Sequence, residues 1–185
     1  ATSSPGQEAL GSRPVAPTGG AEAEEQCMSV VIVVGNPRQG SRTRAAAEAV
    51  ARRLTDEEAD VIELSELGAR LLTWDDEEVA AAKQRVLAAD LVVFASPTFK
   101  ASFTGLLKLF LEQFGSGELD GTTSVALMLG GSPHHSLAPE LTLKPVLSEI
   151  GASIPFPGLY LIDSTWETDG VLDAWLDRAR RLLGR

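Results

Sequence analysis

Short apolar runs alternate with amphipathic stretches along the chain from residue 29 onward. The apolar runs predict strands at residues 29–35, 59–64, 90–96, 122–129 and 154–162. The run at 29–35 is continuous and rich in β-branched residues, which predicts a strand buried on both faces of a parallel sheet, and the run at 90–96 predicts a second buried strand. Apolar residues at helical spacing predict helices at residues 44–54, 75–89, 104–114, 137–150 and 171–183. Strands that alternate with helices pair in parallel through right-handed crossovers, so the pattern predicts a doubly wound α/β fold.

Prolines complicate two of these elements. Pro139 lies near the start of the helix predicted at 137–150 and Pro145 lies within it, so the pattern leaves the shape of this helix open. Pro155 and Pro157 interrupt the early part of the strand predicted at 154–162.

The first 27 residues differ in composition from the rest of the chain. They are rich in Gly, Pro, Ser, Ala and Glu and hold almost no large apolar side chain, so burial cannot repay the entropy of ordering them. We expect a disordered tail at residues 1–27, with an ordered arm that wraps a partner subunit as the alternative. Residues 28–185 then form one domain, in keeping with a total length of 185 residues.

Charge and cysteine content narrow the classes of partner. A formal net charge of −10 argues against nucleic acid and against anionic membrane, because both select basic surfaces. Cys27 is the only cysteine, which excludes an intrachain disulfide and a Cys-based zinc site.

The distribution of apolar residues bears on the location of the protein. No apolar run reaches the ~18–20 residues of a membrane span, and the first 27 residues lack the apolar stretch of a signal peptide. We therefore expect a cytoplasmic protein.

The loop after the first predicted strand has the chemistry of an anion site. It reads GNPRQGSRT at residues 35–43, at the edge where doubly wound sheets bind their ligands. Ser41 and Thr43 offer hydroxyl donors next to unpaired helix amides, and Arg38 offers a charged planar donor. The loop contains neither a nucleotide P-loop nor the G-x-G-x-x-G fingerprint, and its hydroxyl groups suit a phosphomonoester. An ordinary strand–helix turn with Ser41 as N-cap is the alternative.

The loop after the third predicted strand reads SPTFKASFTG at residues 96–105. Phe99 and Phe103 offer an apolar wall for a planar ring, and Thr98 and Lys100 offer polar contacts to the edge of that ring. The alternatives are that the two phenylalanines belong to the core or to a subunit interface, and that Lys100 is a solvated surface charge.

The loop after the fourth predicted strand reads GGSPHHS at residues 130–136. Gly130 and Gly131 permit backbone amides to approach a ring carbonyl closely, where they would stabilise developing negative charge. His134 and His135 are adjacent in sequence and have no carboxylate cluster beside them, so they do not predict a metal site. The sequence shows no Ser-His-Asp or Cys-His arrangement, and we expect no catalytic side chain.

These loops resemble those of the NADPH-dependent FMN reductase family of flavodoxin-like proteins. The resemblance runs from about residue 29 to residue 166, and it is carried by residues 35–43, by SPTFKASFTGLLKLFLE at 96–112 and by LGGSPHHSLAPELTLKPVLSEIGA at 129–152. It is closest to the reductases that supply reduced FMN to two-component monooxygenases. The resemblance implies a flavodoxin-like, doubly wound, five-stranded parallel sheet in the order 2-1-3-4-5 with helices on both faces.

The resemblance also implies which residues bind the cofactor FMN. Asn36 stands where Ser is common in the family and Phe99 where Tyr is common, so one hydroxyl contact is lost at each position. Leu141 stands near the place of a Tyr that some monooxygenase-coupled members carry, a difference that bears on flavin release. The implied contacts are Arg38, Ser41 and Thr43 to the phosphate, Pro97, Thr98, Phe99 and Lys100 along the isoalloxazine, and Gly130, Gly131 and Ser132 near its pyrimidine edge.

The resemblance therefore implies an NAD(P)H-dependent FMN reductase that transfers hydride from NADPH, or NADH, to FMN and forms a homodimer or homotetramer. A flavin-dependent monooxygenase partner would receive the reduced flavin. Phe103 and the helix at 106–114 would contribute to the subunit interface unless they lie in the core. The alternatives are an FMN-containing reductase of quinones, azo dyes or metal oxyanions, a flavodoxin-type electron carrier, and a binding module without cofactor.

Overall fold

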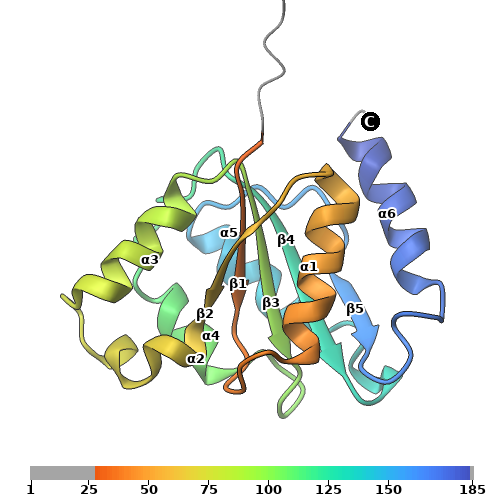
Figure 1. Ribbon diagram of the computed structural model, residues 1–185, viewed down its shortest axis with the longest axis horizontal. Coiled ribbons are helices and arrows are strands. Elements are labelled where there is room, and N and C mark those ends of the chain that lie inside the picture. The colour runs from red at the N-terminus through yellow and green to blue at the C-terminus, as the bar shows by residue number, and fades with distance from the viewer. Residues whose placement is uncertain (1–27, 184–185) are drawn as a thin grey trace, which may run out of the picture.

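A parallel sheet forms the centre of the computed structural model, which describes residues 28–183 (Figure 1). All neighbouring strands pair in parallel, in the order β2-β1-β3-β4-β5, so the flavodoxin-like order is confirmed. The tail predicted at residues 1–27 lies outside the described residues. Within the described part of the chain the strands are β1 (Val30–Val34), β2 (Asp60–Glu63), β3 (Leu91–Pro97), β4 (Thr123–Gly130) and β5 (Leu159–Ile162).

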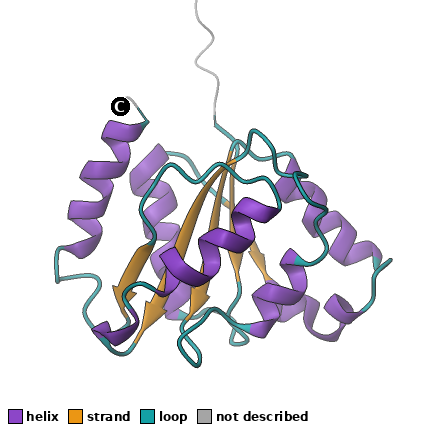
Figure 2. Ribbon diagram, turned by 180° about the vertical axis from the view of Figure 1, so that it is seen from behind, coloured by secondary structure: helices purple, strands orange, loops and turns teal. Residues whose placement is uncertain are grey.

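Helices cover both faces of the sheet (Figures 1 and 2). On one face, α1 (Arg42–Thr55) and α6 (Val171–Leu182) bury their apolar sides in a single core cluster. On the other face, α3 (Glu77–Leu87), α4 (Gly105–Leu111) and α5 (Lys144–Glu149) contribute to a second cluster. The doubly wound architecture predicted from the alternation of elements is therefore confirmed. None of the described helices is long and apolar enough to cross a bilayer.

Strand β1 shows why the apolar runs are continuous. Successive strand side chains point to opposite faces, and Val30, Ile32 and Val34 belong to one core cluster while Val31 and Val33 belong to the other. Every residue of this strand is buried. A central strand covered by helices on both faces has no polar side, which explains the uninterrupted β-branched sequence.

Two short elements after β2 differ from the prediction. The strand predicted to reach residue 64 ends at Glu63, and α2 (Leu64–Leu67) follows at once, succeeded by the 3₁₀ helix η1 (Gly68–Leu72). Elements of four or five residues are too short for a hydrophobic period to show. The helix predicted at 104–114 is also shorter, because α4 ends at Leu111.

The prolines divide the last third of the chain. The helix predicted at 137–150 consists of a π-helical turn, η3 (Pro139–Leu143), followed by α5, whose first turn contains Pro145. Proline lacks an N–H and fits the first turn of a helix, where that donor has no partner. Strand β5 begins at Leu159, beyond Pro155 and Pro157, because proline cannot donate to a strand ladder.

Candidate functional site

A cavity of about 370 Å³ lies at the carboxyl ends of β1, β3 and β4, the lower edge of the sheet in Figure 1. The three loops singled out in the sequence meet there, together with the residue that follows β5. Parallel strands place the loops that follow them at the same edge, so the convergence follows from the topology. The lining residues are Asn36, Pro37, Arg38, Ser41, Arg42, Thr43, Pro97, Thr98, Phe99, Leu129, Gly130, Gly131 and Asp163.

All of the predicted cofactor-binding residues except Lys100 and Ser132 line this cavity. Lys100 lies with Ala101 at the tip of a tight turn, where both residues have a positive φ, 52° and 64°. Ser132 instead caps the short 3₁₀ helix η2 (Pro133–His135), where its hydroxyl oxygen accepts from the backbone N–H of His134 at 3.3 Å. The contribution of these two residues to binding stays a prediction.

Two hydroxyl groups of the first loop keep their protons available for an anion. Ser41 is the N-cap of α1, and its Oγ accepts from the backbone N–H of Arg44 at 3.3 Å. Thr43 Oγ1 accepts from Asn36 Nδ2 at 3.0 Å. A hydroxyl that accepts from a neighbour still has one hydrogen to donate, so both side chains can donate into the cavity that they line.

Among the described residues, Arg38 is the cation of this loop that has no ionic partner. Within residues 28–183 its guanidinium forms no ion pair and no hydrogen bond with a side chain. Arg42 also lines the cavity, but its Nη1 pairs with Asp163 Oδ2 at 3.0 Å. Arg44 is held by two carboxylates on the far side of the loop. An anion in the cavity would therefore meet Arg38 as its unpaired counter-charge.

Asn36 organises the loop from inside. Its Nδ2 fixes Thr43, and its Oδ1 accepts from the backbone N–H of Arg38 at 2.9 Å, the arrangement of an Asx turn. The side chain therefore positions Arg38 and Thr43, two of the three predicted phosphate contacts. The sequence identifies Asn36 only as a departure from the family's common Ser, because hydrogen bonding within a loop leaves no periodic signal.

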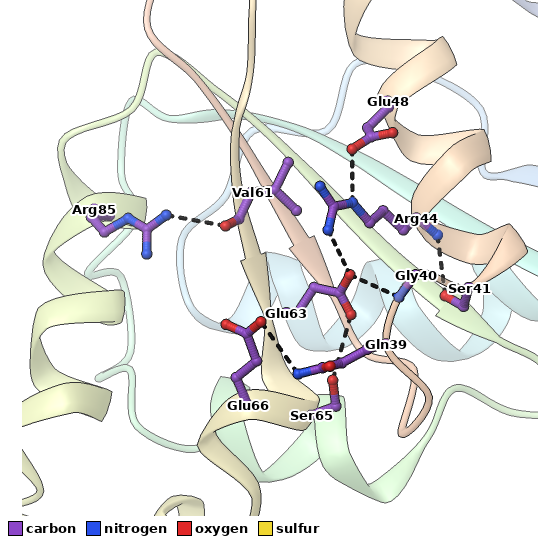
Figure 3. Close-up of polar contacts among 10 residues, drawn as sticks. All are labelled: Gln39, Gly40, Ser41, Arg44, Glu48, Val61, Glu63, Ser65, Glu66 and Arg85. Carbon is purple, nitrogen blue, oxygen red and sulfur yellow. Dashed lines mark hydrogen bonds and ion pairs between the residues drawn. The ribbon is translucent and has the colours of Figure 1, made fainter.

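The back of the same loop rests on a buried carboxylate (Figure 3). Glu63, at the end of β2, has a side chain only 3% exposed, and its Oε1 accepts from the Gly40 N–H at 3.1 Å and from Arg44 Nη1 at 2.9 Å. Arg44 Nε donates to Glu48 at 2.8 Å, and the hydrogen bonds to Glu48 and then Glu63 raise the pKa of Arg44 above its ordinary value. Gly40 has a φ of +57°, in the left-handed region that glycine adopts without strain.

The first and second loops are joined by a buried threonine. Thr104 Oγ1 donates to the carbonyl oxygen of Gly35 at 2.5 Å and accepts from the backbone N–H of Leu107 at 3.2 Å, capping α4. The backbone N–H of Thr104 donates to Ser96 Oγ at 3.0 Å. The side chain of Thr104 therefore joins the residue after β1 to the start of α4, and its backbone N–H adds the end of β3 to the same arrangement.

The two phenylalanines of the second loop lie in different environments. Phe99 is 52% exposed and lines the cavity, as expected for a wall that a planar ring would cover. Phe103 is half-buried and packs against the hydrophobic core, which is the alternative raised from the sequence. The inner side of α4 also belongs to the core, since Leu107, Phe110 and Leu111 are buried.

The third loop is shaped by a tyrosine from β5. Tyr160 is 8% exposed and donates to the carbonyl oxygen of Ser132 at 2.7 Å, and burial raises the pKa of its phenol. A Cβ at Gly130 would lie 2.8 Å from Tyr160 Cζ and closer still to its hydroxyl oxygen, so only glycine fits there. Gly131 is exposed at the rim. No group of metal-ligating side chains is found among the described residues.

Comparison with known proteins identifies the family to which this site belongs. Residues 28–167 match the sequence profile described as NADPH-dependent FMN reductase. The chain belongs to the NADPH-dependent FMN reductase family. A family relative from Pseudomonas putida, an FMN reductase (NADPH), is 32% identical over 142 residues, which are 74% of this chain and 72% of the relative. An NADH-dependent FMN reductase of Pseudomonas putida, SfnF, is 29% identical over 165 residues, which are 83% and 88% of the two chains.

Solved structures agree with this family assignment. The apo form of an NADH:FMN oxidoreductase, EmoB, superposes with a TM-score of 0.76 at 30% identity and covers 83% of this chain and 89% of its own. A flavodoxin from the domain Archaea superposes with a TM-score of 0.54 at 17% identity, covering 84% of this chain and 96% of its own, and so shares the fold alone.

Proposed function

We propose that this FMN reductase binds the phosphate of FMN at the first loop and reduces the flavin with hydride from NADPH or NADH. The free guanidinium of Arg38 carries this proposal. Arg38 lines the same cavity as Ser41 and Thr43, whose hydroxyl donors lie at the N-terminus of α1, a helix of 14 residues. The planar guanidinium, the two hydroxyl donors and the positive end of the helix dipole together suit a phosphomonoester.

The remaining cavity wall suits a flat ring. Pro97, Thr98 and Phe99 form one part of the lining, and Gly130 with Gly131 forms another without bulky side chains. Bound FMN supplies the redox chemistry by accepting a hydride. The chain contributes binding, orientation and polar groups near the ring, which is the usual division of labour in a cofactor enzyme. Lys100 and Ser132 belong to this proposal as contacts expected from the family resemblance.

The relatives differ in the hydride donor for which they are named. One relative is named for NADPH and another for NADH, so we include both donors. Delivery of reduced flavin to a partner monooxygenase in the cytoplasm is part of the same proposal.

The proposal also includes the formation of a homo-oligomer. Leu137 and Leu141 are candidates for its interface, because their side chains are large, apolar and exposed, at 63% and 66%. Light scattering at several concentrations measures the oligomeric state, and a strict monomer would contradict that part.

The visible spectrum of purified protein tests the proposed reaction. We expect NADPH or NADH to bleach the absorbance of added FMN at a rate that depends on the concentration of both protein and free FMN. Tightly retained FMN with quinone turnover would instead support a quinone-type reductase. Bound FMN that neither donor bleaches would indicate an electron carrier, and no uptake of FMN would indicate a binding module.

A further inference from the structure

One buried charge near the cavity has no role in the function proposed above. Glu63 lies at the carboxyl end of β2, and its side chain is 3% exposed. Its Oε1 accepts both from the Gly40 N–H and from Arg44, while Ser65 Oγ lies 3.5 Å from its Oε2 (Figure 3). A carboxylate is costly to bury, so its bonding partners are the first clue to what it does.

The position of Glu63 links it to the phosphate loop. Gly40 lies between Arg38 and Ser41, two residues that line the cavity, while Gly40 itself does not line it. Because the Gly40 N–H donates to Glu63, it cannot also donate to an anion on the other side of the loop. The carboxylate thus selects the loop conformation and removes one amide donor from the phosphate site.

The charge of the network opposes an anion. Glu63 and Glu48 share one cation, Arg44, so this network of two carboxylates and one guanidinium carries one net negative charge. Of the two carboxylates, Glu48 is 40% exposed and screened by solvent, whereas Glu63 is buried and bonded to the loop itself. The electrostatic effect of Glu63 on a phosphate at Arg38 and Ser41 is therefore the larger one.

We propose that Glu63 is a positioning and affinity-setting residue, which holds the phosphate loop through Gly40 and limits how tightly the loop binds the flavin phosphate. The effect keeps FMN exchangeable, as is required of a flavin that leaves after reduction. This inference rests on the proposed binding of FMN at the first loop.

The substitution Glu63→Gln separates the charge from the geometry. Both strong hydrogen bonds of Glu63 end on the same oxygen, Oε1, so a carboxamide oxygen in that place keeps the bonds from Gly40 and Arg44. The amide nitrogen then faces Ser65 Oγ, which is able to accept. Only the negative charge is lost. Glu48→Gln is the matched control, because it removes the same charge from the same arginine without touching the loop.

The experiment compares the dissociation constants of FMN and riboflavin, measured by quenching of flavin fluorescence. We expect Glu63→Gln to bind FMN roughly five- to tenfold more tightly and to leave riboflavin within about twofold, because riboflavin has no phosphate. Glu48→Gln should change FMN affinity by less than about twofold. A Glu63→Gln protein that binds FMN no more tightly, or that gains equally for riboflavin, would overturn the inference.

Two further measurements distinguish a failure of the proposed phosphate site from a failure of the role given to Glu63. Should Glu63→Gln fail to fold, Arg44→Gln removes the compensating cation and should weaken FMN severalfold while sparing riboflavin; unchanged FMN affinity there would also overturn the inference. A wild-type protein that does not distinguish FMN from riboflavin contradicts the proposed phosphate site. A wild-type protein that prefers FMN, with no change in Glu63→Gln, contradicts only the role given to Glu63.

Discussion

The junction between the first two loops gives a quantitative prediction about stability. Replacing Thr104 by Val keeps the shape of the side chain and removes its hydroxyl. The helix α4 then loses its N-cap, at a cost of about 1 kcal/mol. The carbonyl oxygen of Gly35 loses its donor at a buried position, which costs about 1–3 kcal/mol more. We therefore expect Thr104→Val to lower the free energy of unfolding by about 2–4 kcal/mol.

Urea unfolding followed by circular dichroism measures this loss. With a slope of roughly 2 kcal/mol/M, a loss of about 3 kcal/mol moves the midpoint down by about 1.5 M. Thr104→Ser is the control, because it keeps both hydrogen bonds and should lose only about 1 kcal/mol for the methyl group. Equal losses in the two variants, or a loss below about 1 kcal/mol in Thr104→Val, would refute the assignment of the junction to this hydroxyl.

Three other predictions follow from single contacts. Gly130→Ala should lose about 1–3 kcal/mol of stability and much of its flavin affinity, because its Cβ meets the tyrosine of β5, whereas Gly131→Ala has open space and should lose little in a thermal melt. The hydrogen bond from Lys144, followed by that from a backbone amide, lowers the pKa of Glu140, so its stabilisation is present above about pH 4.5 and is lost as the pH falls through the lowered pKa. Denaturant unfolding between pH 3 and pH 7 should accordingly show the difference between wild type and Glu140→Gln shrinking as the pH falls. Asn36→Ala should weaken FMN severalfold and leave riboflavin unchanged in a fluorescence titration, and an equal loss for both flavins would contradict its role in the phosphate loop.

The sheet was predictable because its physical requirements are local. Strands β1 and β3 are buried on both faces, and each carries a continuous apolar run that no surface segment would tolerate. Parallel pairing then places the following loops at one edge, which is why residues as distant as Arg38 and Gly130 line one cavity. The strand order itself followed from the resemblance to the family.

The finer features of the site were not predictable for equally physical reasons. Glu63 lies in a predicted strand, and nothing in the local sequence shows that its side chain reaches a loop 23 residues away. Asn36 and Asp163 act through contacts that depend on the folded loops. The sequence left three readings of Phe103, as a ring wall, a core residue or an interface residue, and its packing against the core depends on contacts that form only in the folded chain.

Binding of FMN and riboflavin to an Arg38→Ala variant tests the central claim most directly. A charge-assisted hydrogen bond is worth about 1.5–3 kcal/mol, so the dissociation constant of FMN should rise by roughly 10- to 150-fold. Riboflavin affinity should stay within about twofold, and Arg42→Ala, whose guanidinium is committed to Asp163, should have a smaller effect on FMN. Unchanged FMN affinity in Arg38→Ala, or an equal loss for both flavins, would contradict a flavin phosphate site at this loop.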